Sequence, residues 1–279
     1  MDMFCFQCEE TSRGTGCTTR GVCGKTAETA CLQDLLIYLL KGISVWGQLA
    51  RQEGVADTET GDFIPRGLFT TITNVNFDPE SVYALAREAW QRRDALHGRF
   101  EAAYLAAHGQ TFAGAVPEAA TWQPREDGLE AWIGYGRRVG VMADGELSQD
   151  LRSLRELLVI GLKGMAAYYE HASVLGKTDP EIVMFMQEAL AVAAEASPSA
   201  DRLLELVMRA GQMGVRTMAL LDAANTEAYG HPEPTQVNLG VVEGPAILIS
   251  GHDLRDLQEL LEQTRGTGVN VYTHGEMLP

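Results

Sequence analysis

No cysteine follows Cys31 in this chain of 279 residues, so every thiol lies in its first 31 positions. Four of the five cysteines, Cys5, Cys8, Cys17 and Cys23, follow a C-x2-C-x8-C-x5-C spacing. Thiols gathered so closely, with none elsewhere to pair with, indicate a metal centre in this segment. Cys31 falls within a helical pattern, and we expect it to be a small buried apolar residue.

Positive charge is also scarce. The chain has 22 Lys and Arg residues against 38 Asp and Glu residues, a formal net charge of −16. Such a balance argues against binding to the phosphate backbone of nucleic acids and against docking on an anionic membrane. It says little about a small neutral substrate. We therefore expect neither a nucleic-acid nor a membrane partner.

Long apolar runs and a basic leader are absent as well. The sequence shows no run of about 18 or more apolar residues, the length that a membrane-spanning helix needs. Its first residues, MDMFC, carry no basic segment followed by an apolar one. We therefore expect no membrane span, no secretion signal and a cytoplasmic location. Cytoplasmic thiols stay reduced, which favours metal binding over disulfides.

Several common catalytic and nucleotide-binding motifs are missing too. The sequence contains no G-x-x-x-x-G-K loop, no G-x-G-x-x-G turn and no G-x-S-x-G elbow. Nucleotide chemistry and serine-nucleophile chemistry therefore lack support.

Periodicity and punctuation divide the chain into three segments. Residues 1–25 form a loop rich in cysteine and glycine, residues 26–234 are helical, and residues 235–279 are mixed. The predicted fold class is a mainly α N-terminal domain of two three-helix bundles, followed by the start of a Rossmann-like α/β domain.

Capping residues followed by apolar positions at spacings of three and four mark the helices. They predict five long helices, which begin at or just after Thr26, Asp78, Ser148, Asp179 and Ser199. A shorter helix is predicted near residues 64–73. Residues 109–147 are expected to be less regular.

The final segment alternates strand, helix and strand. Residues 246–249 and 269–272 predict strands, and Asp253 caps a helix between them, which together make a right-handed parallel crossover. A parallel sheet needs more strands and cover on both faces. We therefore expect an apparently truncated domain and a longer parent protein. Alternatively, the two strands pack on the helical segment or on another subunit.

The cysteine spacing favours an iron–sulfur cluster over zinc. An early C-x2-C pair on a glycine-rich loop is common in such clusters, and the cations Arg13, Arg20 and Lys25 would stabilise a reduced, more negative cluster. Zinc sites usually hold two close cysteine pairs or add histidine. A structural zinc site stays the alternative, and disulfides are least favoured because the cysteine count is odd.

A second group of candidate ligands lies in the mixed segment. His252 follows the first predicted strand and Glu276 follows the second, at the sheet edge where parallel sheets bind ligands. Imidazole and carboxylate together suit iron. On spacing alone, a turn histidine and a solvated glutamate are the simpler interpretation. His274 could face the same side, as a hydrogen-bond donor to that site or as an exposed residue.

The sequence resembles the hybrid cluster proteins, also called the prismane or hydroxylamine reductase family. The resemblance spans the whole chain. It rests on the motifs MFCFQCEET (3–11), GTGC (14–17), GVCGK (21–25), LLIY with KG (35–42), GLKGMAA (161–167), ISGHDL (249–254) and VYTHGEMLP (271–279).

This resemblance implies two metal centres. Cys5, Cys8, Cys17 and Cys23 would hold a cubane 4Fe-4S cluster, and His252 and Glu276 would be two ligands of a hybrid 4Fe-2O-2S cluster. The family's other hybrid-cluster ligands are cysteines and a glutamate from later segments, which this chain lacks. The family's fold has two three-helix bundles and then two α/β domains, and is related to the nickel carbon monoxide dehydrogenases.

The implied function is reduction of hydroxylamine to ammonia and water, here in an N-terminal portion, with electrons from a redox donor protein. Nitric oxide reduction in the parent protein is an alternative. A different class of function, a one-cluster electron-transfer module without catalysis, also fits the chain as it stands.

Overall fold

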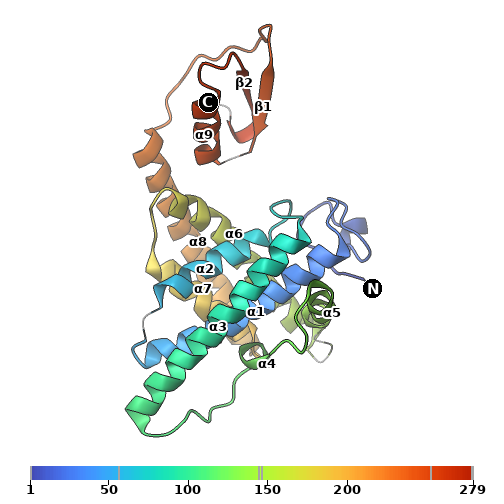
Figure 1. Ribbon diagram of the computed structural model, residues 1–279, viewed down its shortest axis with the longest axis vertical. Helices are drawn as coiled ribbons and strands as arrows, with labels where there is room; N and C mark the ends of the chain where they lie inside the picture. Colours follow the sequence, from blue (N-terminus) through green and yellow to red (C-terminus); the bar gives the residue numbers. More distant parts are fainter. Residues whose placement is uncertain (1, 56, 144, 146, 252, 278–279) are drawn as a thin grey trace.

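The computed structural model describes residues 2–55, 57–143, 145, 147–251 and 253–277. Across these residues the fold is mainly helical, with a small parallel two-stranded sheet near the C-terminus (Figure 1). The predicted fold class is therefore confirmed. Figure 1 shows the sheet standing beyond one end of the helical body, to which the end of the last long helix joins it.

Helix α1, Ala27–Gln52, is the central element of the helical body. The Thr26 side chain caps it by accepting a hydrogen bond from the backbone N–H of Thr29, as the sequence predicts. Its apolar stripe is fully buried and comprises Leu32, Leu35, Leu36, Leu39, Leu40 and Ile43. By length and composition α1 could cross a membrane, but 83% of its apolar window is buried inside the protein. The burial identifies it as a core helix.

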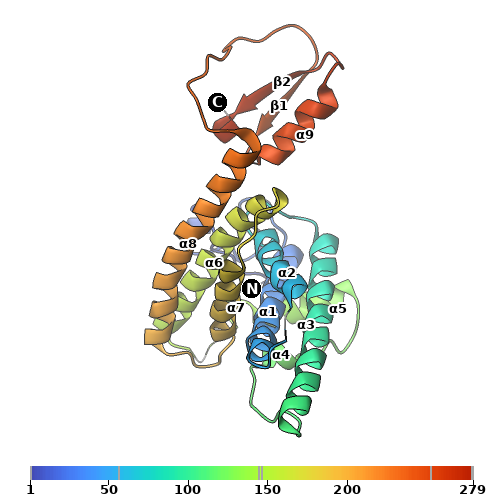
Figure 2. The same ribbon diagram turned by 90° about the vertical axis from the view of Figure 1, so that its left-hand side faces the viewer.

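The other long helices surround α1 in two sets. Helices α2, Thr58–Thr70, and α3, Pro79–His108, belong with α1, whereas α6, Gln149–Val174, α7, Pro180–Ala193, and α8, Ala200–Tyr229, form the second set (Figure 2). The sets interlock, because α2 packs against α6 and α7 packs against α1. One continuous hydrophobic core therefore runs through both.

Residues 109–147, expected to be less regular than the rest of the helical segment, contain two short helices. These are α4, Glu118–Thr121, and α5, Leu129–Val139. Both approach the α1 backbone closely: a Cβ at Gly42 would lie 2.1 Å from the Ala119 carbonyl oxygen, and a Cβ at Gly136 would lie 2.1 Å from the Cys31 carbonyl oxygen. Only glycine permits such contact. The stretch is less regular than the long helices on either side of it, and the sequence did not indicate α4 and α5 because these helices depend on packing against distant residues.

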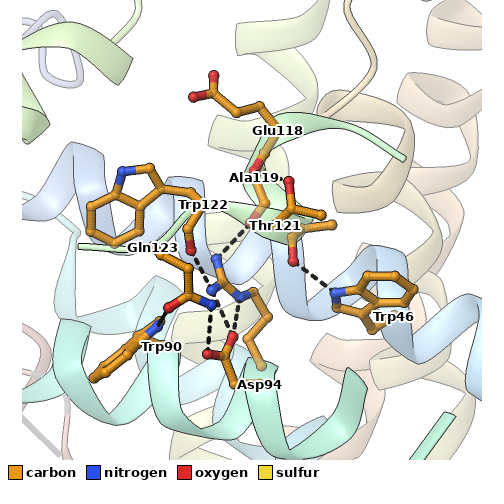
Figure 3. Close-up of polar contacts among 10 residues, drawn as sticks. Trp46, Trp90, Asp94, Glu118, Ala119, Thr121, Trp122 and Gln123 are labelled. Carbon is orange, nitrogen blue, oxygen red and sulfur yellow. Dashed lines mark hydrogen bonds and ion pairs between the residues drawn. The ribbon is translucent and has the colours of Figure 1, made fainter. Parts of the chain in front are cut away.

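Arg93 of α3 fastens the α4 segment to the helical body. Its guanidinium is fully buried, donates a 3.0 Å hydrogen bond to the Ala119 carbonyl and another to the Trp122 carbonyl, and pairs with Asp94. Figure 3 shows Asp94 and Trp90 converging on Gln123, with the Asp94–Gln123 contact at 2.8 Å. Trp46 of α1 donates to the Ala120 carbonyl at 2.8 Å. These contacts satisfy backbone groups that a one-turn helix leaves unpaired.

The mixed segment folds as the predicted crossover. Strands β1, Ala246–Ser250, and β2, Asn270–His274, pair in parallel from Ala246 opposite Asn270 to Ser250 opposite His274, and helix α9, Leu254–Thr264, joins them. The sheet is not covered on all sides, since Leu248 is 70% exposed. Contacts with the helical body include two polar ones: His171 of α6 lies 3.2 Å from Asp253, and Tyr229 of α8 donates to Gln258 at 3.3 Å.

Candidate metal centre

Backbone pairing joins two parts of the cysteine-rich loop to each other, and side-chain packing seats the loop on the start of α1. Cys5 and Cys17 form an antiparallel bridge in which each N–H donates to the other's carbonyl, at 3.0 and 2.8 Å. The buried side chains of Met3, Cys17 and Ala30 pack together beneath it. Two of the four predicted ligands, twelve positions apart in sequence, are thereby placed side by side.

Cys17 lies in an environment that favours its thiolate. Its Sγ accepts a hydrogen bond from the backbone N–H of Ser12 at 3.4 Å and lies 3.7 Å from the Thr11 hydroxyl. The hydrogen bond from Ser12, followed by one from the Val22 backbone, lowers the pKa of the Cys17 thiol. A depressed pKa is what a metal-binding thiol requires, because only the thiolate is a ligand.

The other predicted ligands differ in exposure. Cys5 and Cys8 are half-buried, whereas Cys23 is exposed. Gly21 packs against the last of these, since a Cβ at Gly21 would lie 3.0 Å from the Cys23 sulfur. All five cysteines are free thiols.

The donor set fits an iron–sulfur cluster in its chemistry. Four free thiols share one loop, backbone N–H groups point at a ligand sulfur, and two buried lysines, Lys25 and Lys163, lie close by. Within the described ranges, however, no three Cys, His, Asp or Glu side chains come together closely enough to hold one metal ion. The structure therefore places Cys5 beside Cys17 without showing a closed four-sulfur arrangement.

Sequence patterns did not identify a buried lysine, Lys163, that adjoins the cysteine loop. Lys163 of α6 donates to the Gln7 side-chain oxygen at 3.1 Å, and Gln7 lies between Cys5 and Cys8. Lys163, Gln7 and Asp34 of α1 are among the residues that line a cavity of about 50 Å³. The only sequence signal for Lys163 is a lysine on the apolar face of a helix, within the GLKGMAA motif.

Burial shifts the pKa values of Asp34 and Lys163. Desolvation raises the pKa of the Asp34 carboxyl and lowers the pKa of the Lys163 ammonium, while the attraction between the two opposes both changes. Lys25 is also buried and donates to the Gln33 side chain at 2.6 Å. Cationic and anionic groups are thus confined together behind the cysteine loop.

Cys31 lies outside the quartet. It is 2% exposed, as expected for a small apolar residue in a helix, and its Sγ lies 3.4 Å from the Asp2 carbonyl oxygen. Burial, followed by repulsion from Asp34, raises the pKa of the Cys31 thiol to about 11. This thiol is therefore a poor ligand at neutral pH.

The second predicted ligand pair lies largely outside the described residues. His252 is among the residues not described, and so is the side chain of Glu276. Their sequence neighbours follow the carboxyl ends of paired strands, because β1 ends at Ser250 and β2 ends at His274. The Nδ1 atom of His274 lies 3.2 Å from the Ser250 hydroxyl, so this histidine links the two strand ends.

Histidines for which sequence indicated no special partner do make defined contacts. His171 lies 3.2 Å from Asp253, the cap of α9, and so joins the helical body to the strand–helix–strand unit. His97 stacks on Trp46 with a centroid separation of 4.0 Å. Neither contact has a short-range sequence signature.

Comparison with known proteins places the chain in a family. Residues 3–279 match the Prismane/CO dehydrogenase family. A protein of Halothermothrix orenii named hydroxylamine reductase is 56% identical over 279 residues, which is 100% of this chain and 50% of that protein. One of Nitratidesulfovibrio vulgaris with the same name is 54% identical over 99% of this chain and 49% of its own length. A hydroxylamine reductase of Desulfitobacterium hafniense is 53% identical over 100% of this chain and 49% of its own length.

The chain spans about half the length of the curated relatives it matches. The match nevertheless runs through the cysteine loop, the helical body and the strand–helix–strand unit. The chain therefore belongs to the Prismane/CO dehydrogenase family.

Proposed function

We propose that this chain is the N-terminal half of an iron–sulfur hydroxylamine reductase, which reduces hydroxylamine with two electrons and two protons to ammonia and water. The observation that carries the proposal is the 53–56% identity, over all or nearly all of this chain, to proteins named hydroxylamine reductase. Membership of the family implies an iron–sulfur cofactor. A small nitrogenous substrate and a redox donor protein would be its partners.

The roles of individual residues form the finer part of the proposal. Cys5, Cys8, Cys17 and Cys23 hold a 4Fe-4S cluster, supported by the four free thiols on one loop and the lowered pKa of Cys17. When bound, such a cluster supplies one-electron transfer at the N-terminal end of the protein. The Cys5–Cys17 bridge fixes the spacing of two ligands, and the Ser12 N–H compensates charge on the ligand sulfur.

His252 and Glu276 provide two of the ligands of a hybrid 4Fe-2O-2S cluster. The support is their place in sequence after the paired ends of β1 and β2, an edge where open parallel sheets bind ligands. A complete hybrid site needs further thiolates, and this sequence has no cysteine beyond Cys31. The corresponding segments are residues 1–25 for the cluster loop, 26–234 for the helical domain and 235–279 for the beginning of an α/β domain.

A second candidate function is a one-cluster electron-transfer module. It is favoured by the half-length match and by the confinement of all cysteines to the first 31 residues. Iron and sulfide counting on anaerobically prepared protein separates the two candidates. About four irons per chain indicates the module, and about eight indicates a chain that completes both clusters. We expect four for this chain, with no hydroxylamine turnover by reduced viologen, and both clusters with turnover in the longer parent.

Cysteine substitution tests the ligand assignment directly. Cys17→Ser is expected to abolish the visible iron–sulfur absorbance, whereas the matched control Cys31→Ser is expected to retain iron, because Cys31 lies outside the quartet. Unaltered iron in Cys17→Ser would refute the assignment. A colourless wild-type protein that contains zinc would instead establish the structural zinc alternative.

A further inference from the structure

A hydrogen-bonded chain connects the buried face of α6 to a ligand sulfur in the cysteine loop. The Lys163 Nζ atom donates to the Gln7 Oε1 atom at 3.1 Å, and the Gln7 Nε2 atom donates to the Cys5 Sγ atom at 3.8 Å. Lys163 and Gln7 are 156 positions apart in sequence. The lysine is only 6% exposed, so it is part of the protein interior.

The lysine determines which way the Gln7 amide faces. A lysine ammonium has three donors and no acceptor, so it can pair only with the amide oxygen. With Oε1 held by Lys163, the amide's N–H2 group is left to face the Cys5 sulfur. Without Lys163 the amide could turn over and present an oxygen to that sulfur instead.

Packing alone does not account for a lysine at this position. Burying an ammonium is costly unless it is paired and hydrogen-bonded, and an unbranched apolar side chain would fill the same space. Asp34 offsets part of the cost, since its attraction favours the charged form of Lys163 against desolvation. Lys25, a second buried lysine near the loop, acts in the opposite sense by disfavouring charge on Lys163. Two cations are thus kept behind the loop despite their mutual repulsion.

We propose that Lys163 is a positioning residue for the N-terminal cluster: it orients Gln7 as a hydrogen-bond donor to Cys5 and places a positive charge behind the loop, and both effects raise the cluster's reduction potential. This inference rests on the proposed function, because it assumes that the four cysteines hold a cluster. Reduction adds one negative charge, which hydrogen bonds to the sulfurs and nearby cations stabilise.

Potentiometric titration of the anaerobic protein with viologen dyes tests the proposal. One electron passes from the reduced dye to the cluster, and no bond is made or broken. Lys163→Met is expected to lower the potential by at least 59 mV, which for one electron is a tenfold loss in the reduction equilibrium constant. The matched control is Lys177→Met, because Lys177 is a partly exposed lysine, far from the cysteines in sequence, that pairs with Glu227 at 2.5 Å. It is expected to leave the potential unchanged.

A second variant separates the hydrogen bond from the charge. Gln7→Leu removes the donor to Cys5 but keeps the Lys163 ammonium, so its shift should be in the same direction and smaller. If Lys163→Met fails to fold or to retain iron, Gln7→Leu decides the question, because its potential must fall. A merely structural lysine would change protein stability without changing the potential of the cluster that remains.

The outcomes distinguish this inference from the function on which it rests. An iron-free wild-type protein refutes the proposed function and this inference with it. A wild-type protein that holds four irons, with potentials in Lys163→Met and Gln7→Leu equal to the Lys177→Met control, refutes the inference alone.

Discussion

Replacing Arg93 with methionine is expected to destabilise the helical body by about 3 kcal/mol. Methionine has a similar length and fills much of the same buried space. The stability that is lost therefore comes from the hydrogen bonds of the guanidinium. The substitution leaves the Ala119 and Trp122 carbonyls without their buried donor, and each such group costs roughly 1–3 kcal/mol. Relief of the cost of burying a charged guanidinium offsets part of that sum.

The neighbouring Arg92 provides a matched control. Its side chain is 31% exposed and pairs with Glu88 one turn away at 2.8 Å, an interaction worth about 0.3–0.5 kcal/mol. Arg92→Met removes the same charge from the same helix. It also gives up a contact with the Phe63 ring and an exposed 3.3 Å hydrogen bond to the Glu59 carbonyl, which water can replace, so its total cost is expected to stay below about 1 kcal/mol.

Urea unfolding followed by circular dichroism at the helical band measures both variants. With a urea slope of about 3 kcal/mol per M for a chain of this size, the Arg93→Met midpoint falls by about 1 M. Tryptophan emission should shift as well, because Trp122 and Trp90 adjoin the hydrogen bonds that are lost. An Arg93→Met midpoint equal to that of Arg92→Met would show that Arg93 does not secure α4.

Three further predictions concern α1 and its contacts. Gly136→Ala forces a Cβ to within 2.1 Å of a backbone oxygen and should lower the unfolding free energy, measured in urea, by about 1–3 kcal/mol. The control Gly134→Ala adds a Cβ in open space and should raise the unfolding free energy by up to about 1 kcal/mol. Equal urea midpoints for the two variants would contradict the close packing of α5 on α1. In metal-free protein at pH 8, the Cys31 thiol should be alkylated about a hundredfold more slowly than a thiol of pKa 9, because only the thiolate reacts. The alkylation rate should rise as the pH approaches 11. Alkylation of Cys31 as fast as that of exposed Cys23 would refute the raised pKa. Thr26→Ala should lower the unfolding free energy by about 1 kcal/mol through loss of the α1 cap, and an unchanged thermal midpoint would count against the cap.

Much of the helical fold could be predicted because its boundaries are local. Asp78 followed by a proline marks the start of α3, and Gly109, in a left-handed conformation at φ 69°, caps its end directly after the last helical residue, His108. The β1–α9–β2 unit was likewise predicted from short-range patterns. The interlocking of α2 with α6 was not, because apolar periodicity identifies a buried face but not the partner that covers it.

In the candidate site, too, local sequence patterns could be read, whereas contacts between distant residues could not. The quartet of cysteines was evident from spacing, and its role as the ligand set of a cluster stays a prediction. The Lys163–Gln7 contact could not be predicted, since 156 residues separate its members and only the packing of the cysteine loop beside α6 brings them together. The assignments of His252 and Glu276 remain predictions from the family resemblance.

The sheet of β1 and β2 has open edges and an exposed apolar side chain, which affect the solubility of this chain when it is prepared by itself. Among the residues that the structure describes, each strand pairs with one neighbour only, and Leu248 projects an apolar side chain that is 70% exposed. Open strand edges with apolar side chains recruit strands from other molecules. We therefore expect the isolated polypeptide to self-associate as its concentration rises, and a solubilising change such as Leu248→Lys to widen the usable range without touching the cysteine loop.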